Sequence, residues 1–238
     1  KYYYRVIKYE MSNYFESLDY FNNKLNLSFI SVVNKSEIME DTRKAIQKIN
    51  ITMDQVATPI QEHTNIVRWA DSSGVYKKCD GVVTNLKYNI ILSLSVADCT
   101  PVCLFDPVSS NYALIHSGWR GTCEKVVNNA IQLILSKGSK LEDILVYLGP
   151  SISQKNYEVD IDVASCFSKE NYILKGKKYL LDIKSQIKND IIEVGIKLEN
   201  VYSSNRCTYQ ESNLCSYRRD GTNAGRMIFL MGKYSGRN

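Results

Sequence analysis

The chain of 238 residues carries 30 lysine and arginine residues against 25 aspartate and glutamate residues, a formal net charge of +5. Its 44% hydrophobic and 23% charged residues are typical of a globular protein with a sizeable core. The basic residues are scattered rather than clustered, which argues against a nucleic-acid partner. No stretch of the sequence reaches the roughly 18 apolar residues of a membrane span, and the N-terminus lacks the apolar region of a signal peptide, so we expect a cytoplasmic protein with no membrane partner.

The cysteine content argues against two common kinds of site. The sequence contains seven cysteines at irregular spacing: Cys79, Cys99, Cys103, Cys123, Cys166, Cys207 and Cys215. The absence of any CxxC pair from the sequence speaks against a zinc ribbon or an iron–sulfur cluster. An odd number without regular spacing does not resemble a secreted disulfide framework, so we predict mostly reduced thiols and a structural role for Cys207.

The first half of the chain alternates between helical and strand patterns. Residues 36–49 have apolar side chains at helical spacing, with Ser36 as the N-cap. Strands are predicted over residues 90–96, 102–105 and 112–115. The turn-forming stretch 106–111 separates the last two strands, which predicts a hairpin.

The second half of the chain continues this mixture. After Gly121 the apolar period changes to 3.6 residues, which predicts a helix capped by Thr122 and ended by Gly138. Further elements are predicted as strands over 144–148, 201–202 and 227–231 and a helix over 184–199. We therefore expect a single domain over residues 1–238, of the α/β or α+β class with mixed β-sheets.

Three residues that can carry chemistry follow or precede these strands. Cys99 follows the first predicted strand and His116 the third, so the hairpin returns the chain close to its start. The other of the two histidines, His63, precedes a short apolar stretch. A thiolate and two imidazoles are usual zinc ligands, and three protein ligands leave a fourth position open. The spacing alone leaves three interpretations open: this metal site, a Cys99 nucleophile with His116 as its base, and a cysteine of the core.

Other polar and aromatic residues also allow two roles each. Arg218 and Arg219 are predicted either to clamp an anionic group or to form a solvated, salt-bridged loop. Asp80 and Asp98 either orient a metal-bound histidine or cap turns. Trp119 is predicted to pack in the core rather than to stack on a base.

Several short motifs follow one another in a fixed order between about residues 60 and 230. They are Gln61-x-His63, Asp80-Gly81-Val82-Val83-Thr84, Ala97-Asp98-Cys99-Thr100-Pro101-Val102, His116-Ser117-Gly118-Trp119-Arg120-Gly121, Leu148-Gly149-Pro150-Ser151-Ile152, Tyr157-Glu158-Val159, Cys207-Thr208-Tyr209, Ser216-Tyr217-Arg218-Arg219-Asp220-Gly221 and Gly225-Arg226-Met227. In type, order and spacing this set resembles the YfiH-like laccase-domain family. The likeness is weaker in the N-terminal third of the chain.

The resemblance implies a zinc site and a nucleoside-processing enzyme. It implies that His63, Cys99 and His116 coordinate one Zn²⁺, within mixed sheets between helices in α/β/β/α layers. The implied reaction is phosphorolysis of adenosine, inosine, guanosine or methylthioadenosine, with adenosine deamination as a side activity. Small purine nucleosides and phosphate are then the partners. Substrate-binding positive charge is expected from three arginines: Arg120, Arg218 and Arg219.

Three alternatives remain at this point. Copper-dependent oxidation of phenols is disfavoured, because a trinuclear copper centre needs more imidazoles than two histidines supply, although copper binding as such is possible. A peptidoglycan-precursor editing factor would leave nucleosides untouched and alter muramyl-peptide composition. A Cys99 nucleophile without metal would be sensitive to alkylation and insensitive to chelation.

Overall fold

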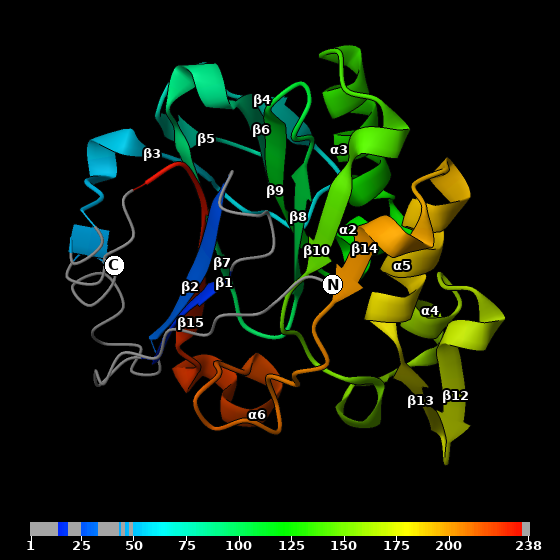
Figure 1. Cartoon of the computed structure of the whole chain (residues 1–238). Coiled ribbons are helices and arrows are strands. Elements are labelled where there is room, and N and C mark those ends of the chain that lie inside the picture. The colour runs from blue at the N-terminus through cyan, green and yellow to red at the C-terminus, as the bar shows by residue number, and fades with distance from the viewer. Residues whose placement is uncertain (1–13, 19–24, 33–42, 44–45, 48–49, 235–238) are drawn as a thin grey trace.

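Two six-stranded β-sheets that pack face to face form the centre of the molecule (Figure 1). The structure is a computed structural model, and it describes residues 14–18, 25–32, 43, 46–47 and 50–234. Both sheets are mixed, and the chain crosses between them several times. These crossings determine where the candidate site residues lie.

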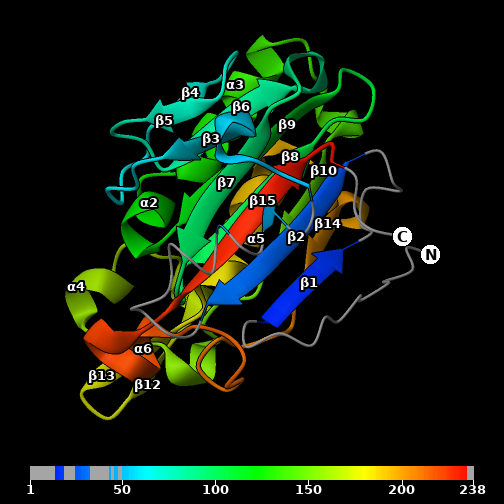
Figure 2. The same ribbon diagram turned by 90° about the vertical axis from the view of Figure 1, so that its left-hand side faces the viewer.

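The first sheet joins strands from both ends of the chain. Its strands, in spatial order, are β1 (Tyr14–Leu18), β2 (Asn26–Val32), β15 (Arg226–Gly232), β7 (Ile91–Val96), β3 (Val56–Pro59) and β5 (Gly74–Tyr76). The first four pair antiparallel, whereas β7, β3 and β5 run parallel to one another. Figure 2 shows β7, β15, β2 and β1 side by side.

The second sheet contains the predicted hairpin. Its order is β14 (Val201–Ser203), β10 (Leu145–Leu148), β8 (Thr100–Phe105), β9 (Asn111–Ser117), β6 (Gly81–Asn85) and β4 (Val67–Trp69). The central pairs are antiparallel and the two outermost pairs are parallel. A small third sheet comprises β11 (Glu158–Val159), β13 (Lys178–Leu181) and β12 (Tyr172–Lys175).

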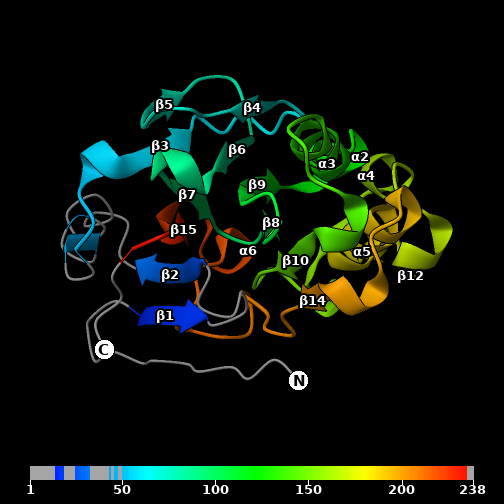
Figure 3. The same ribbon diagram turned by 45° about the horizontal axis from the view of Figure 1, so that its top comes forward.

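Helices pack on the outer face of the second sheet (Figure 3). They are α2 (Trp119–Cys123), α3 (Val126–Ser136), α4 (Ile161–Ala164) and α5 (Ile183–Val194), and α6 (Tyr217–Asp220) lies at the lower end of the molecule in Figures 1 and 2. On the outer face of the first sheet, the helical residue Ile46 packs with Ile51 against apolar residues of β2 and β15. The layers are therefore α/β/β/α, as expected.

Strict alternation along the strands divides the core into separate clusters. In β15, Phe229 faces the space between the two sheets, whereas Ile228 and Leu230 face outward. In β9, Leu114 lies between the sheets, whereas Ile115 packs under the helices. Both faces of these strands are buried, which explains why they appear in the sequence as continuous apolar runs.

The structure confirms the predicted strands and alters the helix boundaries. The helix expected after Gly121 begins earlier, at Trp119, and is interrupted at Lys125, whose φ of 61° is left-handed. Thr122 is not its cap, because the Thr122 hydroxyl donates to the Gly118 carbonyl at 2.9 Å. The helix predicted over 184–199 ends at Val194, since Gly195 adopts a left-handed φ of 113°.

Two further predictions are matched only in part by the described residues. The helix expected over 36–49 lies mostly outside the described residues, although Arg43, Ile46 and Gln47 are helical. The third predicted strand continues through Ser117, so His116 belongs to β9 rather than following it. Among the described residues, none of the helices combines the length and the apolar character needed to cross a bilayer.

Candidate metal centre

His63, Cys99 and His116 converge although 36 and 17 positions separate them along the chain. His63 lies between β3 of the first sheet and β4 of the second, and Cys99 lies in the turn between β7 and β8, which also links the two sheets. His116 projects from β9. One ligand atom of each side chain lies within 4.8 Å of the other two, so the three atoms are grouped closely enough that they could hold one metal ion.

The carboxylate of Asp80 organises the segment that carries His63. It is fully buried and accepts the backbone N–H groups of Glu62, His63 and Thr64 at 3.2, 3.0 and 2.6 Å. The Thr64 hydroxyl adds a fourth bond at 2.9 Å. These bonds hold His63 at a left-handed φ of 59°, a conformation that costs a non-glycine residue about 1–3 kcal/mol. Strain of this kind at a polar residue is typical of functional sites.

The same carboxylate fixes the orientation of the second histidine. His116 Nδ1 lies 2.7 Å from Asp80 Oδ1, and the backbone N–H of His116 donates to the Asp80 carbonyl at 2.6 Å. With Nδ1 engaged, Nε2 is the ring nitrogen available to a ligand. Asp80 therefore fulfils both roles that the sequence allowed, because it orients a histidine and caps a turn.

The charged groups of the cluster shift the pKa values of one another so that the charged forms are favoured. Burial by itself raises the pKa of Asp80, but hydrogen bonds from His116 and Thr64 outweigh it and lower the pKa to about 2. Burial lowers the pKa of His116, yet Asp80 and Cys99 raise it to about 9. Burial likewise raises the pKa of Cys99, and the two histidines more than offset this and lower it to about 6. Cys99 is thus held toward the thiolate, the form that binds metals and attacks electrophiles.

Asp98 ties the Cys99 turn to the C-terminal segment. Its φ is 85°, and its carboxylate accepts the Thr208 hydroxyl and the Arg218 backbone N–H, both at 2.6 Å. The Asp98 carbonyl accepts the Ile152 N–H at 3.0 Å. Asp98 therefore positions the backbone beside Cys99, and no bond from it to either histidine is formed among the described residues.

Gly118 leaves the space that the cluster occupies. A Cβ at this position would lie 3.0 Å from Cys99 Sγ, 3.3 Å from His63 Cδ2 and 3.8 Å from His116 Cε1. The extended backbone of Gly118, with φ of −82°, suits any residue. Glycine is needed here for its missing side chain and not for its conformational freedom.

The cluster opens into a pocket of about 570 Å³. His116 is buried, Cys99 is half-buried and His63 is exposed, so one side of the cluster faces the pocket. The other lining residues are Pro59, Gln61, Ser95, Val96, Ala97, Asp98, Tyr157, Tyr217, Arg218 and Arg226. A pocket with aromatic walls, two guanidinium groups and a potential metal site has the composition of a small-molecule binding site.

The three arginines predicted to bind substrate lie in different places. Arg218 lines the pocket, where its Nη1 donates to the Glu158 carbonyl at 2.7 Å and its guanidinium lies 5.3 Å from the Tyr157 ring centre. Arg120 lies within α2, is exposed and stacks on Trp119 at 4.3 Å, outside the residues that line the pocket. Trp119 itself packs partly against the core under the helices, as predicted.

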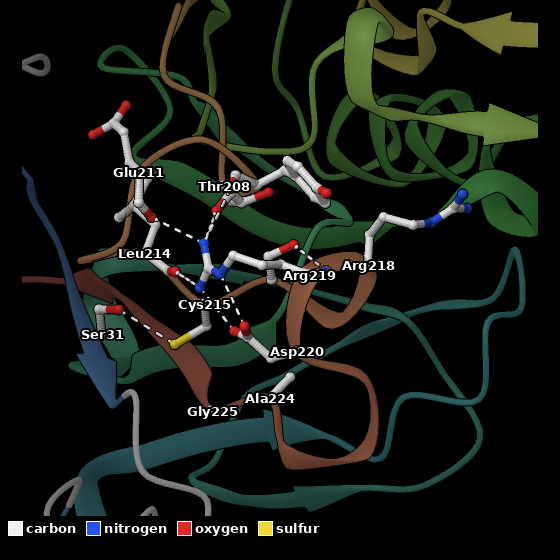
Figure 4. A network of polar contacts seen from close by, with 12 residues as sticks. Ser31, Thr208, Glu211, Leu214, Cys215, Arg218, Arg219, Asp220, Ala224 and Gly225 are labelled. Atoms are coloured by element: carbon white, nitrogen blue, oxygen red, sulfur yellow. Dashed lines mark hydrogen bonds and ion pairs between the residues drawn. The ribbon is translucent and has the colours of Figure 1, made fainter.

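The Arg219 side chain stabilises its own loop through hydrogen bonds (Figure 4). Its guanidinium donates to the Asp220 carboxylate and to backbone carbonyls of Thr208, Tyr209, Glu211 and Leu214, at 2.8–3.3 Å. With these acceptors the group is saturated by its own loop, which also carries Arg218. Figure 4 shows the Arg218 side chain pointing away from this network.

The pocket residues without a functional role assigned from the sequence include Gln61, Tyr157, Tyr217 and Arg226. Each of these four belongs to one of the motifs quoted above, which was the available signal. Gln61 also pairs with the backbone of Ser95 through bonds of 2.8 and 3.0 Å, which join the His63 segment to β7. Buried Cys207 accepts the N–H of Ser153 at 3.3 Å, in keeping with a structural role.

The donor set fits a divalent transition metal. Two imidazoles and a thiolate with an open side suit a catalytic zinc. A His₂Cys set also occurs in blue-copper proteins, which add a weak axial ligand such as methionine. No methionine is among the described residues that line this pocket, and the open side faces a cavity large enough for a substrate.

Comparison with known proteins identifies the family of the chain. The profile of the family described as "Multi-copper polyphenol oxidoreductase laccase" matches residues 15–233. A purine nucleoside phosphorylase of Haemophilus influenzae is 32% identical over 219 residues, which cover 83% of this chain and 82% of that protein. Adenosine deaminase RL5, from an unknown prokaryotic organism, is 26% identical over 199 residues and 75% of each chain.

A solved structure agrees with the fold over nearly the whole chain. The crystal structure of YlmD from Geobacillus stearothermophilus superposes with a TM-score of 0.85, at 20% identity, over 96% of this chain and 99% of that one. At that identity the likeness establishes the fold. Together with the profile match, it shows that the chain belongs to the YfiH/YlmD laccase-domain family.

Proposed function

We propose that this protein is a zinc-dependent purine nucleoside phosphorylase that acts on adenosine, inosine, guanosine and methylthioadenosine. Adenosine deamination would be a side activity of the same site. The observation that carries the proposal is the convergence of His63, Cys99 and His116 at a pocket that also contains Arg218. The activities in the names of the two relatives support it.

The ligands and their partners suit such a site. Bound by His63, Cys99 and His116, a zinc ion would keep one position open to polarise phosphate or water. Asp80 holds His116 Nδ1 and the backbone of the His63 segment, so both imidazoles are oriented in advance. Orientation of this kind raises metal affinity and fixes the geometry of the ligands.

Arg218 is the arginine best placed to bind phosphate. Phosphorolysis needs an anion held beside the anomeric carbon of the ribose, and a guanidinium binds phosphate with two parallel hydrogen bonds. Arg218 and Arg226 line the same pocket as the metal ligands, and Asp98 fixes the backbone of Arg218. Substrate binding by Arg120 and Arg219 stays a prediction. Arg120 does not line the pocket, and the Arg219 guanidinium is hydrogen-bonded to its own loop.

The pocket also suits a purine nucleoside in size and character. Tyr157 and Tyr217 offer aromatic surface, which stacks well on a purine ring. Gln61, held by Ser95, and the exposed rim residue Tyr217 add polar atoms for a ribose. The volume of about 570 Å³ is within the usual range for ligand pockets.

One observation favours a second candidate. The lowered pKa of Cys99, about 6, and its contact with His116 are also what a metal-free cysteine nucleophile needs. In that case the Cys99 thiolate attacks the anomeric carbon of the ribose, the bond to the purine breaks as His116 protonates the leaving base, and phosphate then displaces the thiolate to give ribose 1-phosphate. The two candidates differ in their response to chelation, which abolishes only the first activity.

We expect Cys99→Ser to abolish base release from adenosine. Wild-type protein should produce adenine and ribose 1-phosphate only when phosphate is present, and the variant should be slower by at least about 100-fold, because a metal supplies several kcal/mol to such a transition state. Rates are measured by chromatography, with and without a zinc chelator. Cys166→Ser, at an exposed cysteine, is the matched control. Activity that survives chelation would instead favour the cysteine nucleophile.

Asp80→Asn should weaken zinc binding by about 10–100-fold, because the amide cannot hold His116 and the His63 backbone as the carboxylate does. A competition titration with a chromophoric chelator measures this affinity. Asp106→Asn is a matched control, since Asp106 is equally buried and hydrogen-bonded, but to the turn residues Val108 and Ser109. Equal zinc affinity in the two variants would contradict the role given to Asp80.

Arg218→Ala should raise the KM for phosphate by about 10–100-fold, the value of one or two charge-assisted hydrogen bonds. Zinc content should not change. Arg120→Ala serves as the control, because Arg120 is exposed on α2 and does not line the pocket. A larger increase in this KM from Arg120→Ala than from Arg218→Ala would contradict the assignment of Arg218 as the phosphate-binding arginine.

A further inference from the structure

A second pocket, of about 260 Å³, is lined mainly by residues at the beginning of α5 and in the segment that follows β14. It is lined by Ile152, Ser153, Gln154, Asp182, Lys184, Ser185, Lys188, Ser203, Ser204, Asn205 and Arg206. Three of these residues are cationic and one is acidic. None of the residues that line it belongs to the metal centre or to the lining of the larger pocket.

Lys184 is the most constrained of these cations. Its half-buried side chain donates from Nζ to the Ser204 carbonyl at 2.6 Å. Burial lowers the pKa of Lys184 to about 8, because neighbouring Asp182 and Cys207 compensate only partly. An anion bound beside the ammonium group would remove this penalty.

The pocket carries an excess of positive charge. Asp182 uses its carboxylate to cap α5 by accepting the Ser185 N–H at 2.9 Å. Arg206 pairs with Glu211 at 2.6 Å and is thereby neutralised. Lys184 and Lys188 stand one helical turn apart on the same face of α5, and neither takes part in an ion pair among the described residues.

We propose that this second pocket binds a phosphate group, either inorganic phosphate or the phosphate of a small monoester. Two lysines supply the charge, and Ser185 and Ser203 line the same space as possible neutral donors, whereas the hydroxyl of the third lining serine, Ser153, already donates to Asn156 Oδ1 at 3.1 Å. The volume exceeds the roughly 30 Å³ of one water several-fold, which leaves room for a phosphate and a small organic group. No aromatic residue is among the described residues that line it, so a stacked purine is not favoured. The proposal is independent of the activity proposed for the metal centre.

Titration of the full-length protein with phosphate, followed by ¹H–¹⁵N NMR, tests this directly because it reads the two pockets separately. Inorganic phosphate and glycerol 3-phosphate are added at constant ionic strength. We expect saturable shifts in the amides of Ser185, Ser204 and Asn205. Tighter binding of the ester would assign the pocket to a monoester, and equal binding would assign it to inorganic phosphate.

In the double variant Lys184→Gln/Lys188→Gln, the phosphate affinity obtained from these shifts should fall at least about tenfold. The shifts around Arg218 should persist. Because Lys184 is half-buried, Lys188→Gln alone provides a second, milder variant with an effect in the same direction. Lys197→Gln is the control, since Lys197 is exposed and lies outside the pocket. The proposal is wrong if neither anion saturates, if sodium chloride produces the same shifts, or if both lysine variants bind like the wild type.

Discussion

The carboxylate of Asp80 bonds to both histidine-bearing segments of the candidate metal centre. It accepts the backbone N–H of His63 and contacts His116 Nδ1, so one buried charge determines the conformation of a loop and the orientation of an imidazole. Asp80 can do this because it immediately precedes β6, which pairs with β9 at Gly81 and Ile115. The sheet ladder thus sets the distance between the carboxylate and His116. The left-handed backbone of His63 depends on the same bonds.

The rest of the site depends on where the chain passes from one sheet to the other. His63 and Cys99 lie on two such crossings, and the core between the sheets holds the crossings together. Asp98 then links the Cys99 turn to Thr208 and Arg218, in the segment that returns to the first sheet as β15. The three candidate metal ligands and Arg218, which lie far apart in the sequence, are therefore brought to one pocket by hydrogen bonds and strand pairing.

Local patterns predicted six of the strands, β7 to β10, β14 and β15, but not the roles of the residues around the candidate metal centre. The spacing left the roles of His63, Cys99 and His116 open, and only the family resemblance implied them as one set of ligands. The hairpin of β8 and β9 followed from apolar runs and a turn, and it places Cys99 near His116. The break at Lys125 was missed because a lysine gives no signal for a left-handed backbone. Arg219 was predicted either to clamp an anion or to form a salt-bridged loop, and its observed acceptors are the Asp220 carboxylate and backbone carbonyls of one loop, which no side-chain pattern reveals. Arg226 and Tyr157 reach the pocket through long-range pairing that spacing along the chain cannot show.

The family profile refers to several copper ions, whereas this chain has two histidines, both in one cluster with Cys99. X-ray absorption at the metal edges of the purified protein separates the possibilities most directly. We predict a zinc edge, with one sulfur at about 2.3 Å, two imidazole nitrogens at about 2.0–2.1 Å and one further light atom. A protein loaded with copper, or a zinc spectrum without sulfur, would contradict the assignment of His63, Cys99 and His116 as the ligands of a single zinc ion.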